Sequence, residues 1–212
     1  MDETLVGRRL SQLRHQGSRR PTTHMDDRAA SRRELFSQPA EVTLYERNVI
    51  IMVTGIVIPH ETGFELFTHE FSNLASYQAA VGGYIETIRL DGHPLVIVAN
   101  EEGKVMRLPA NRRATCLWWL LNPNGLGGDT LVGDVVVLGP IERGEMSDAS
   151  ANLVSLLLET SRFQVQVRLS KKFDSWVPIG DPVDDFFEAT TRALRLMEVW
   201  SPPDEVRVVA AP

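Results

Sequence analysis

The chain has 212 residues, a hydrophobic fraction of 43% and a formal net charge of -6 at pH 7. This length and apolar content suit one domain with a packed core, with or without a small second unit. The overall acidity excludes a generic polyanion-binding protein. Cys116 is the only cysteine, so an intramolecular disulfide is excluded and a reducing compartment is expected. The sequence has no apolar run of the ~18 residues that span a bilayer and no secretory signal, which predicts a cytoplasmic protein.

Residues 1–40 are predicted to form a basic flexible arm. Residues 1–34 contain eight arginines and five acidic residues, and few large apolar side chains precede Val42. This composition is typical of a solvated tail. A basic segment can also contact phosphates, so nucleic-acid binding through residues 8–33 is a second interpretation. The sequence leaves the first residue of the natural protein open between Met1, Met25 and Met52.

Residues 41–140 are predicted to form an α+β domain with a small, mostly antiparallel sheet and short helices. The expected strands are 49–58, 64–68, 84–90, 95–99, 104–108 and 133–138. A helix over 73–81 is expected to be capped by Ser72 and ended by Gly82. A second helix, over 112–120, is expected to start at the N-cap Asn111.

Residues 141–203 are predicted to add a C-terminal helix–strand–helix extension, and residues 204–212 an unstructured tail. The first helix is expected to begin near Ser147 or Asp148. A half-exposed strand is expected at 163–169, because apolar and polar residues alternate there. Asp181 and Pro182 resemble the cap and first position of the last helix.

Four motifs occur in series: Val81-Gly-Gly-Tyr-Ile-Glu86, Asn100-Glu-Glu-Gly-Lys104, Leu108-Pro-Ala-Asn-Arg-Arg-Ala114 and Val132-Gly-Asp-Val-Val-Val-Leu-Gly139. The series resembles a small uncharacterised domain family of phages, plasmids and actinobacterial mobile elements. The resemblance covers roughly residues 50–139. It implies a mobile-element origin and supplies no catalytic residue.

One cluster of charged and amide side chains is predicted to bind a small anionic ligand. Its members are Asn100, Glu101, Glu102, Lys104, Arg107, Asn111, Arg112 and Arg113. Arginine side chains bind phosphate or carboxylate in bidentate fashion, and a helix N-terminus adds positive potential. The alternative is an ordinary hairpin turn whose acids pair with Arg112 and Arg113.

The adjacent Trp118 and Trp119 point about 100° apart on a helix, so one of them can remain near the surface. An exposed tryptophan would be a candidate contact for a protein partner. The alternative is that the C-terminal helix covers both.

The sequence favours neither a metal site nor a cofactor site. His60, His69 and His93 fall near loops without a recognised metal spacing. Cys116 lies in an apolar helix, which predicts an inert thiol. The glycine-rich segment 125–128 follows a helix and precedes a strand, whereas a phosphate-binding glycine loop has the opposite order.

The sequence therefore predicts a non-enzymatic binding protein of a mobile genetic element. It is expected to act on a host protein or a small anionic ligand, in counter-defence or host takeover. One alternative is a nucleic-acid-associated regulator that uses the arginine-rich arm. A weaker alternative is a nucleotide-processing enzyme that uses Glu101 or Glu102. The sequence leaves the oligomeric state open.

Overall fold

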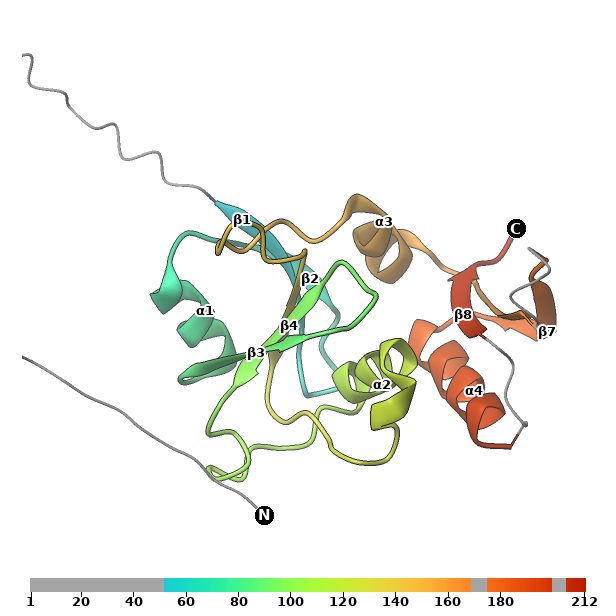
Figure 1. The fold of residues 1–212 in the computed structure, drawn as a ribbon, viewed down its shortest axis with the longest axis horizontal. Helices are drawn as coiled ribbons and strands as arrows, with labels where there is room; N and C mark the ends of the chain where they lie inside the picture. The colour runs from blue at the N-terminus through green and yellow to red at the C-terminus, as the bar shows by residue number, and fades with distance from the viewer. Residues whose placement is uncertain (1–51, 169–174, 200–204) are drawn as a thin grey trace, which may run out of the picture. The chain divides into compact units, whose positions relative to one another are not determined.

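The computed structural model describes residues 52–168, 175–199 and 205–212. The predicted arm, residues 1–40, lies outside them. The described chain forms two antiparallel sheets with four α-helices, which confirms the predicted α+β class (Figure 1). None of the described helices is long and apolar enough to cross a membrane.

The first sheet has five strands in the order β2-β1-β5-β4-β3, and every neighbouring pair is antiparallel. The strands are β1 (Val53–Ile58), β2 (Phe67–Phe71), β3 (Ile85–Arg89), β4 (Val96–Asn100) and β5 (Val135–Leu138). The three central strands are nearly free of polar residues, because each of them is covered on both faces. Residues Lys104–Arg107 form turns instead of the expected strand at 104–108.

Two helices supply the cores on the two faces of this sheet. Tyr77 and Val81 of α1 (Leu74–Val81) share a core with Val98 and Val136. Leu117 of α2 (Arg112–Leu121) belongs to the other core, with Ile97. The alternation of side chains along β4 and β5 therefore decides which helix each residue contacts.

The predicted ends of these two helices are mostly confirmed. Gly82 ends α1 in the left-handed conformation, with φ 74°. Asn111 caps α2 as expected. The cap of α1 is Asn73 and not Ser72, because the Asn73 side chain accepts a hydrogen bond from the backbone N–H of Ser76 at 3.0 Å.

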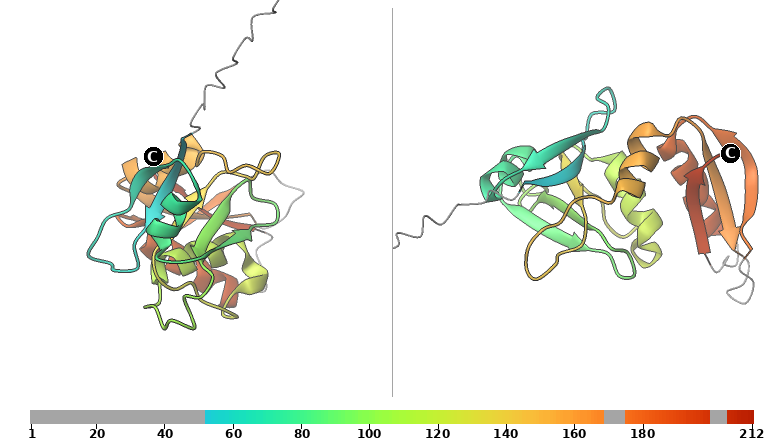
Figure 2. Two further views of the ribbon diagram at one scale, coloured as in Figure 1. Left: turned by 90° about the vertical axis from the view of Figure 1, so that its left-hand side faces the viewer. Right: turned by 90° about the horizontal axis from the view of Figure 1, so that it is seen from above.

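The second sheet has the order β7-β6-β8, with β6 (Phe163–Arg168), β7 (Val177–Val183) and β8 (Glu205–Ala210). The helix α4 (Phe186–Val199) packs against β6 and β8 (Figure 2). The expected half-exposed strand is therefore largely buried, since β6 is the central strand and lies under α4. The expected unstructured tail at 204–212 is wrong, because most of it forms β8.

The start of α4 also differs from the prediction. Asp181 and Pro182 belong to β7. Asp185 precedes the helix and accepts a hydrogen bond from the Glu188 N–H at 2.7 Å. The preceding helix, α3 (Ala151–Val154), starts after the N-cap Ser150 rather than near Ser147, and it continues into the π-helical segment η2 (Ser155–Glu159).

The two sheets share one hydrophobic core. Leu117 and Leu120 of α2 lie in the same buried cluster as Phe186 and Ala193 of α4. The described residues belong to one compact unit. The packing of α2 against α4 positions the side chains described next.

Candidate functional site

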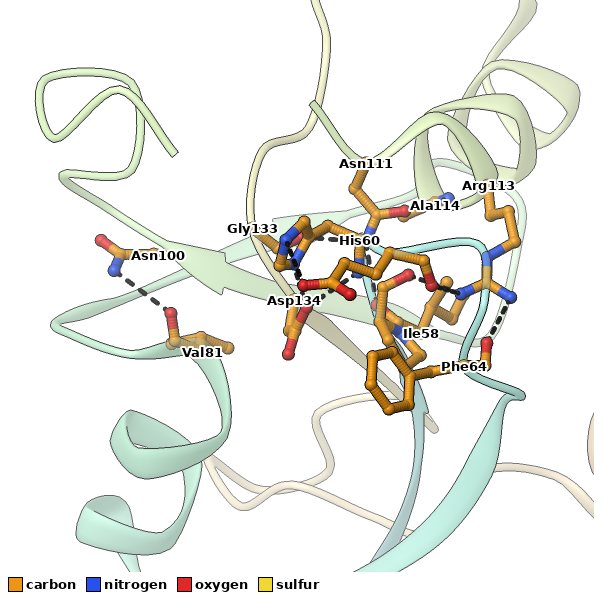
Figure 3. A network of polar contacts seen from close by, with 12 residues as sticks. Ile58, His60, Phe64, Val81, Asn100, Asn111, Arg113, Ala114, Gly133 and Asp134 are labelled. Atoms are coloured by element: carbon orange, nitrogen blue, oxygen red, sulfur yellow. Dashed lines mark hydrogen bonds and ion pairs between the residues drawn. The ribbon is translucent and has the colours of Figure 1, made fainter. Parts of the chain in front are cut away.

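Asn111 is a fully buried structural residue at the start of α2. Its Nδ2 donates to the carbonyl of Ile58 at 2.8 Å and to that of Gly133 at 2.9 Å, and its Oδ1 accepts from the Ala114 N–H at 3.0 Å (Figure 3). Both amide hydrogens are thus used within the protein. Asn111 anchors α2 to the sheet, which corrects the prediction that it contacts a ligand.

Arg113 braces the loop between β1 and β2. One terminal nitrogen donates to the Phe64 carbonyl at 2.8 Å, and the other to the carbonyls of Pro59 and Glu61 at 2.7 and 2.9 Å (Figure 3). Partial burial lowers the pKa of Arg113, while the nearby carboxylates of Asp185 and Asp134 oppose that shift. The terminal nitrogens of Arg113 are therefore already hydrogen-bonded within the protein. Arg113 can act on a ligand only through its positive charge.

His60 lies in the same loop and is bound to Asp134. One Asp134 oxygen accepts from the His60 backbone N–H at 2.8 Å and lies 2.7 Å from His60 Nδ1. The sequence places His60 near a loop and gives no indication of a partner. No motif signals this contact, because the two residues are 74 positions apart and meet only through the pairing of β1 with β5.

An arginine-lined groove of about 520 Å³ runs between α2 and α4. Its lining residues are Arg112, Arg113, Cys116, Phe187, Glu188, Thr191, Arg192 and Arg195. Arg192 is paired with Glu188 at 2.6 Å. Arg112 and Arg195 are exposed, and neither has a hydrogen bond or ion pair among the described residues. The groove therefore presents two available guanidinium groups, one from each helix.

Cys116 gives this groove a thiol. Burial raises the pKa of Cys116, and a hydrogen bond with Thr191 opposes the shift. The thiol is therefore largely protonated near neutral pH, which makes it a weak nucleophile.

The other residues of the predicted anion-binding cluster lie elsewhere. Asn100, Glu101 and Lys104 line a second cleft of about 310 Å³, together with Trp118 and Asp129. Lys104 is paired with Asp129. Asn100 is buried, donates to the Val81 carbonyl at 3.2 Å and accepts from the Glu102 N–H at 2.9 Å. The acidic turn therefore faces this cleft rather than Arg112 and Arg113.

Glu102 and Arg107 line neither of these two spaces. Both are exposed, and Arg107 has a positive φ of 57° in the turn. The predicted cluster of eight residues thus divides into a structural asparagine, a mixed-charge cleft, two outlying side chains and the arginine-lined groove.

Trp118 and Trp119 are both partly buried against the core. Trp119 Nε1 donates to the Asp129 carbonyl at 2.9 Å. Large apolar side chains that are well exposed include instead Tyr84, Val105 and Met106. A direct partner contact through the tryptophans is thus restricted to their exposed edges.

Within residues 52–168, 175–199 and 205–212, no three His, Cys, Asp or Glu side chains lie close enough to hold a metal ion.

Comparison with known proteins gives one solved structure and one family. The solved structure is titled the crystal structure of small RNA methyltransferase HEN1. It is 17% identical, with a TM-score of 0.32 over 48% of this chain and 15% of that chain, and this likeness is too low for any argument. Comparison with curated proteins finds no match. A family model described as a domain of unknown function, DUF3846, matches residues 53–162. The expected uncharacterised domain family is confirmed, and the match extends beyond residue 139. The chain belongs to the DUF3846 family.

Proposed function

We propose that this protein binds a small phosphate-bearing ligand in the arginine-lined groove between α2 and α4, without transforming it. The observation that carries the proposal is the presence in one groove of Arg112 and Arg195, neither of which has an ion-pair partner among the described residues. Two guanidinium groups from opposite walls can each bind phosphate oxygens through a pair of N–H groups.

The local charge supports an anionic ligand. The groove is lined by four arginines and one glutamate, whereas the whole chain has a net charge of -6. A concave surface lined by charges of one sign concentrates the opposite charge. Arg113 and Arg192, although bound to other groups, still contribute to this positive field.

The chemistry of the groove favours binding over turnover. Its thiol, Cys116, has a raised pKa because it is partly buried, so the reactive thiolate is scarce near neutral pH. The remaining lining groups are cationic, aromatic or already hydrogen-bonded, with Arg192 and Glu188 paired to each other.

The wider role we propose is that of a cytoplasmic binding protein of a phage or plasmid, acting in counter-defence or host takeover. The motif series described above supports this role by analogy alone. The protein would use this groove to deplete a host phosphate-bearing metabolite. It would use the same groove to recognise an anionic patch on a host protein.

The proposal is tested by titrating the full-length protein with inorganic pyrophosphate in a calorimeter. The Arg112→Ala/Arg195→Ala variant should bind with an affinity lowered by roughly 1.5–3 kcal/mol for each charge-assisted bond lost. Arg89→Ala/Arg143→Ala removes the same charge from exposed positions outside the groove and should bind like the wild type.

A parallel titration with a single-stranded oligonucleotide addresses the nucleic-acid alternative. Salt-dependent binding that is lost on deleting residues 1–40, and unaffected by the Arg112 and Arg195 changes, would favour the arm over the groove.

A further inference from the structure

A third space, a cavity, is lined by residues of α2, α4 and β8. It measures about 660 Å³, within the range of roughly 300–1,000 Å³ that small-molecule pockets occupy. Its walls are largely apolar, with Leu117 and Leu121 from α2, Met197 from α4 and Val208 from β8. It shares no lining residue with the arginine-lined groove.

The cavity is built by two parts of the chain together. Leu121 and Leu156 belong to the segment that matches the DUF3846 model, whereas Met197 and Val208 belong to the segment that follows it. Leu156 also lies on the π-helical segment η2. Such segments are rare in proteins, and those that occur are often found at functional sites.

A positive charge is fixed at the rim of this cavity. Arg207 of β8 lies over the Trp176 ring at 3.9 Å from its centroid, and both residues line the cavity. Its Nε and one terminal nitrogen donate to Gln166 Oε1 at 3.0 and 2.8 Å. Gln166 is neutral. Glu205, whose side chain also lines the cavity, is paired with Arg168. Arg207 is thus oriented by a neutral partner and has no ion pair with a carboxylate among the described residues.

From this combination we infer that the cavity binds a small amphipathic carboxylate, of the size of a medium-chain fatty acid. Its apolar part would occupy the space between α2, α4 and β8, and its carboxylate would pair with Arg207. The alkyl chain of such a ligand would cover the apolar cavity wall and remove it from water, which is favourable. The carboxylate matches the guanidinium group in shape and charge.

The inference is tested on the full-length protein with decanoate and decan-1-ol, which share an alkyl chain and differ in charge. Wild-type protein is expected to bind decanoate more tightly than decan-1-ol. Arg207→Gln should weaken decanoate binding about tenfold, as expected for one lost charge-assisted bond, and leave decan-1-ol binding unchanged. Arg112→Ala, in the other groove, should change neither.

A second variant tests the location of the alkyl chain. Leu121→Trp fills the cavity from a partly buried wall position and should abolish the binding of both ligands while thermal melting stays cooperative. Leu153→Trp, another partly buried wall position, serves the same purpose if the first variant does not fold.

Three results would overturn the inference. They are the absence of decanoate binding to the wild type, unchanged binding in a folded cavity-filling variant, and an equal loss of both ligands in Arg207→Gln. Because the test uses neither Arg195 nor pyrophosphate, its outcome is independent of the function proposed for the arginine-lined groove.

Discussion

Arg112 and Arg113 are adjacent in the sequence, yet their side chains serve different parts of the structure. Arg113 donates to three backbone carbonyls of the loop between β1 and β2. Arg112 is exposed in the groove formed with α4 and has no partner among the described residues. One position of the pair therefore stabilises the fold, and the other is available to a ligand.

This division predicts that two single substitutions change the free energy of unfolding by different amounts. Arg113→Ala should lower the free energy of unfolding by roughly 2–4 kcal/mol, because three carbonyls lose a charged donor. Arg112→Ala should change it by no more than about 0.5 kcal/mol, as is usual for an exposed position. Urea unfolding of both variants measures the difference. Equal stabilities would show that the loop does not depend on Arg113.

The two asparagine caps provide a second matched pair. Asn111→Ala should cost roughly 3–5 kcal/mol, because it leaves a buried N–H and two buried carbonyls without their partners. Asn73→Ala removes an exposed cap and should cost about 1 kcal/mol. The same urea experiment compares them. A small cost at Asn111 would contradict its role as the anchor between α2 and the sheet.

Phe186 and Phe187 test which face of α4 is buried. Phe186 is 5% exposed and belongs to the shared core, whereas Phe187 is only partly buried and lines the arginine-lined groove. Phe186→Ala is therefore expected to cost roughly 3–5 kcal/mol. Phe187→Ala should cost only about 1–2 kcal/mol, since less of its surface leaves water on folding. Thermal melting that ranks the two variants in the reverse order would contradict the assigned face.

The predictability of α4 shows where sequence reasoning succeeds and where it fails. Its apolar pattern indicates a helix with a wide buried stripe, and the helix is present. The apolar pattern contains no information on the neighbouring strand. It therefore predicts that Asp181 and Pro182 start the helix, although both residues belong to β7. Likewise, β8 pairs with β6 across a separation of about forty residues, and such pairing is invisible to local patterns.

The same limit applies to the candidate site. The role of Asn111 as a helix cap follows from local chemistry, and so does the prediction that Arg112 binds an anion. Arg192 and Arg195 carried no signal, because their proximity to Arg112 depends on the packing of α2 against α4. The sequence predicts that the acidic turn lies near Arg112 and Arg113, whereas the fold directs that turn toward the cleft of Trp118 and Asp129.

That cleft contains one pH-dependent interaction. The hydrogen bond from Lys104, followed by that from the Thr130 backbone N–H, holds the pKa of Asp129 below its usual value of 3.8. Because the folded pKa is lowered, the contribution to stability is present above about pH 3.8 and is lost as the pH falls through the folded pKa. The contribution is small, since both side chains are more than half exposed.

Melting temperatures of the wild type and Asp129→Asn, compared from about pH 6 to about pH 2, measure this dependence. The two curves should differ at the upper end of that range and converge at the lower end. A constant difference across the range would contradict the pairing with Lys104.

The most direct test of the central claim, that an anion occupies the groove between α2 and α4, uses Cys116 as a reporter. Cys116 is the only cysteine of the chain and lines that groove, so alkylation by neutral iodoacetamide reports on this place alone. Its raised pKa predicts slow alkylation near pH 7 and faster alkylation as the pH increases. At one fixed pH, saturating pyrophosphate should slow alkylation of the wild type and leave the rate of Arg112→Ala/Arg195→Ala unchanged. Pyrophosphate binding without protection of Cys116, or equal protection in the double variant, would place the ligand elsewhere and contradict the account.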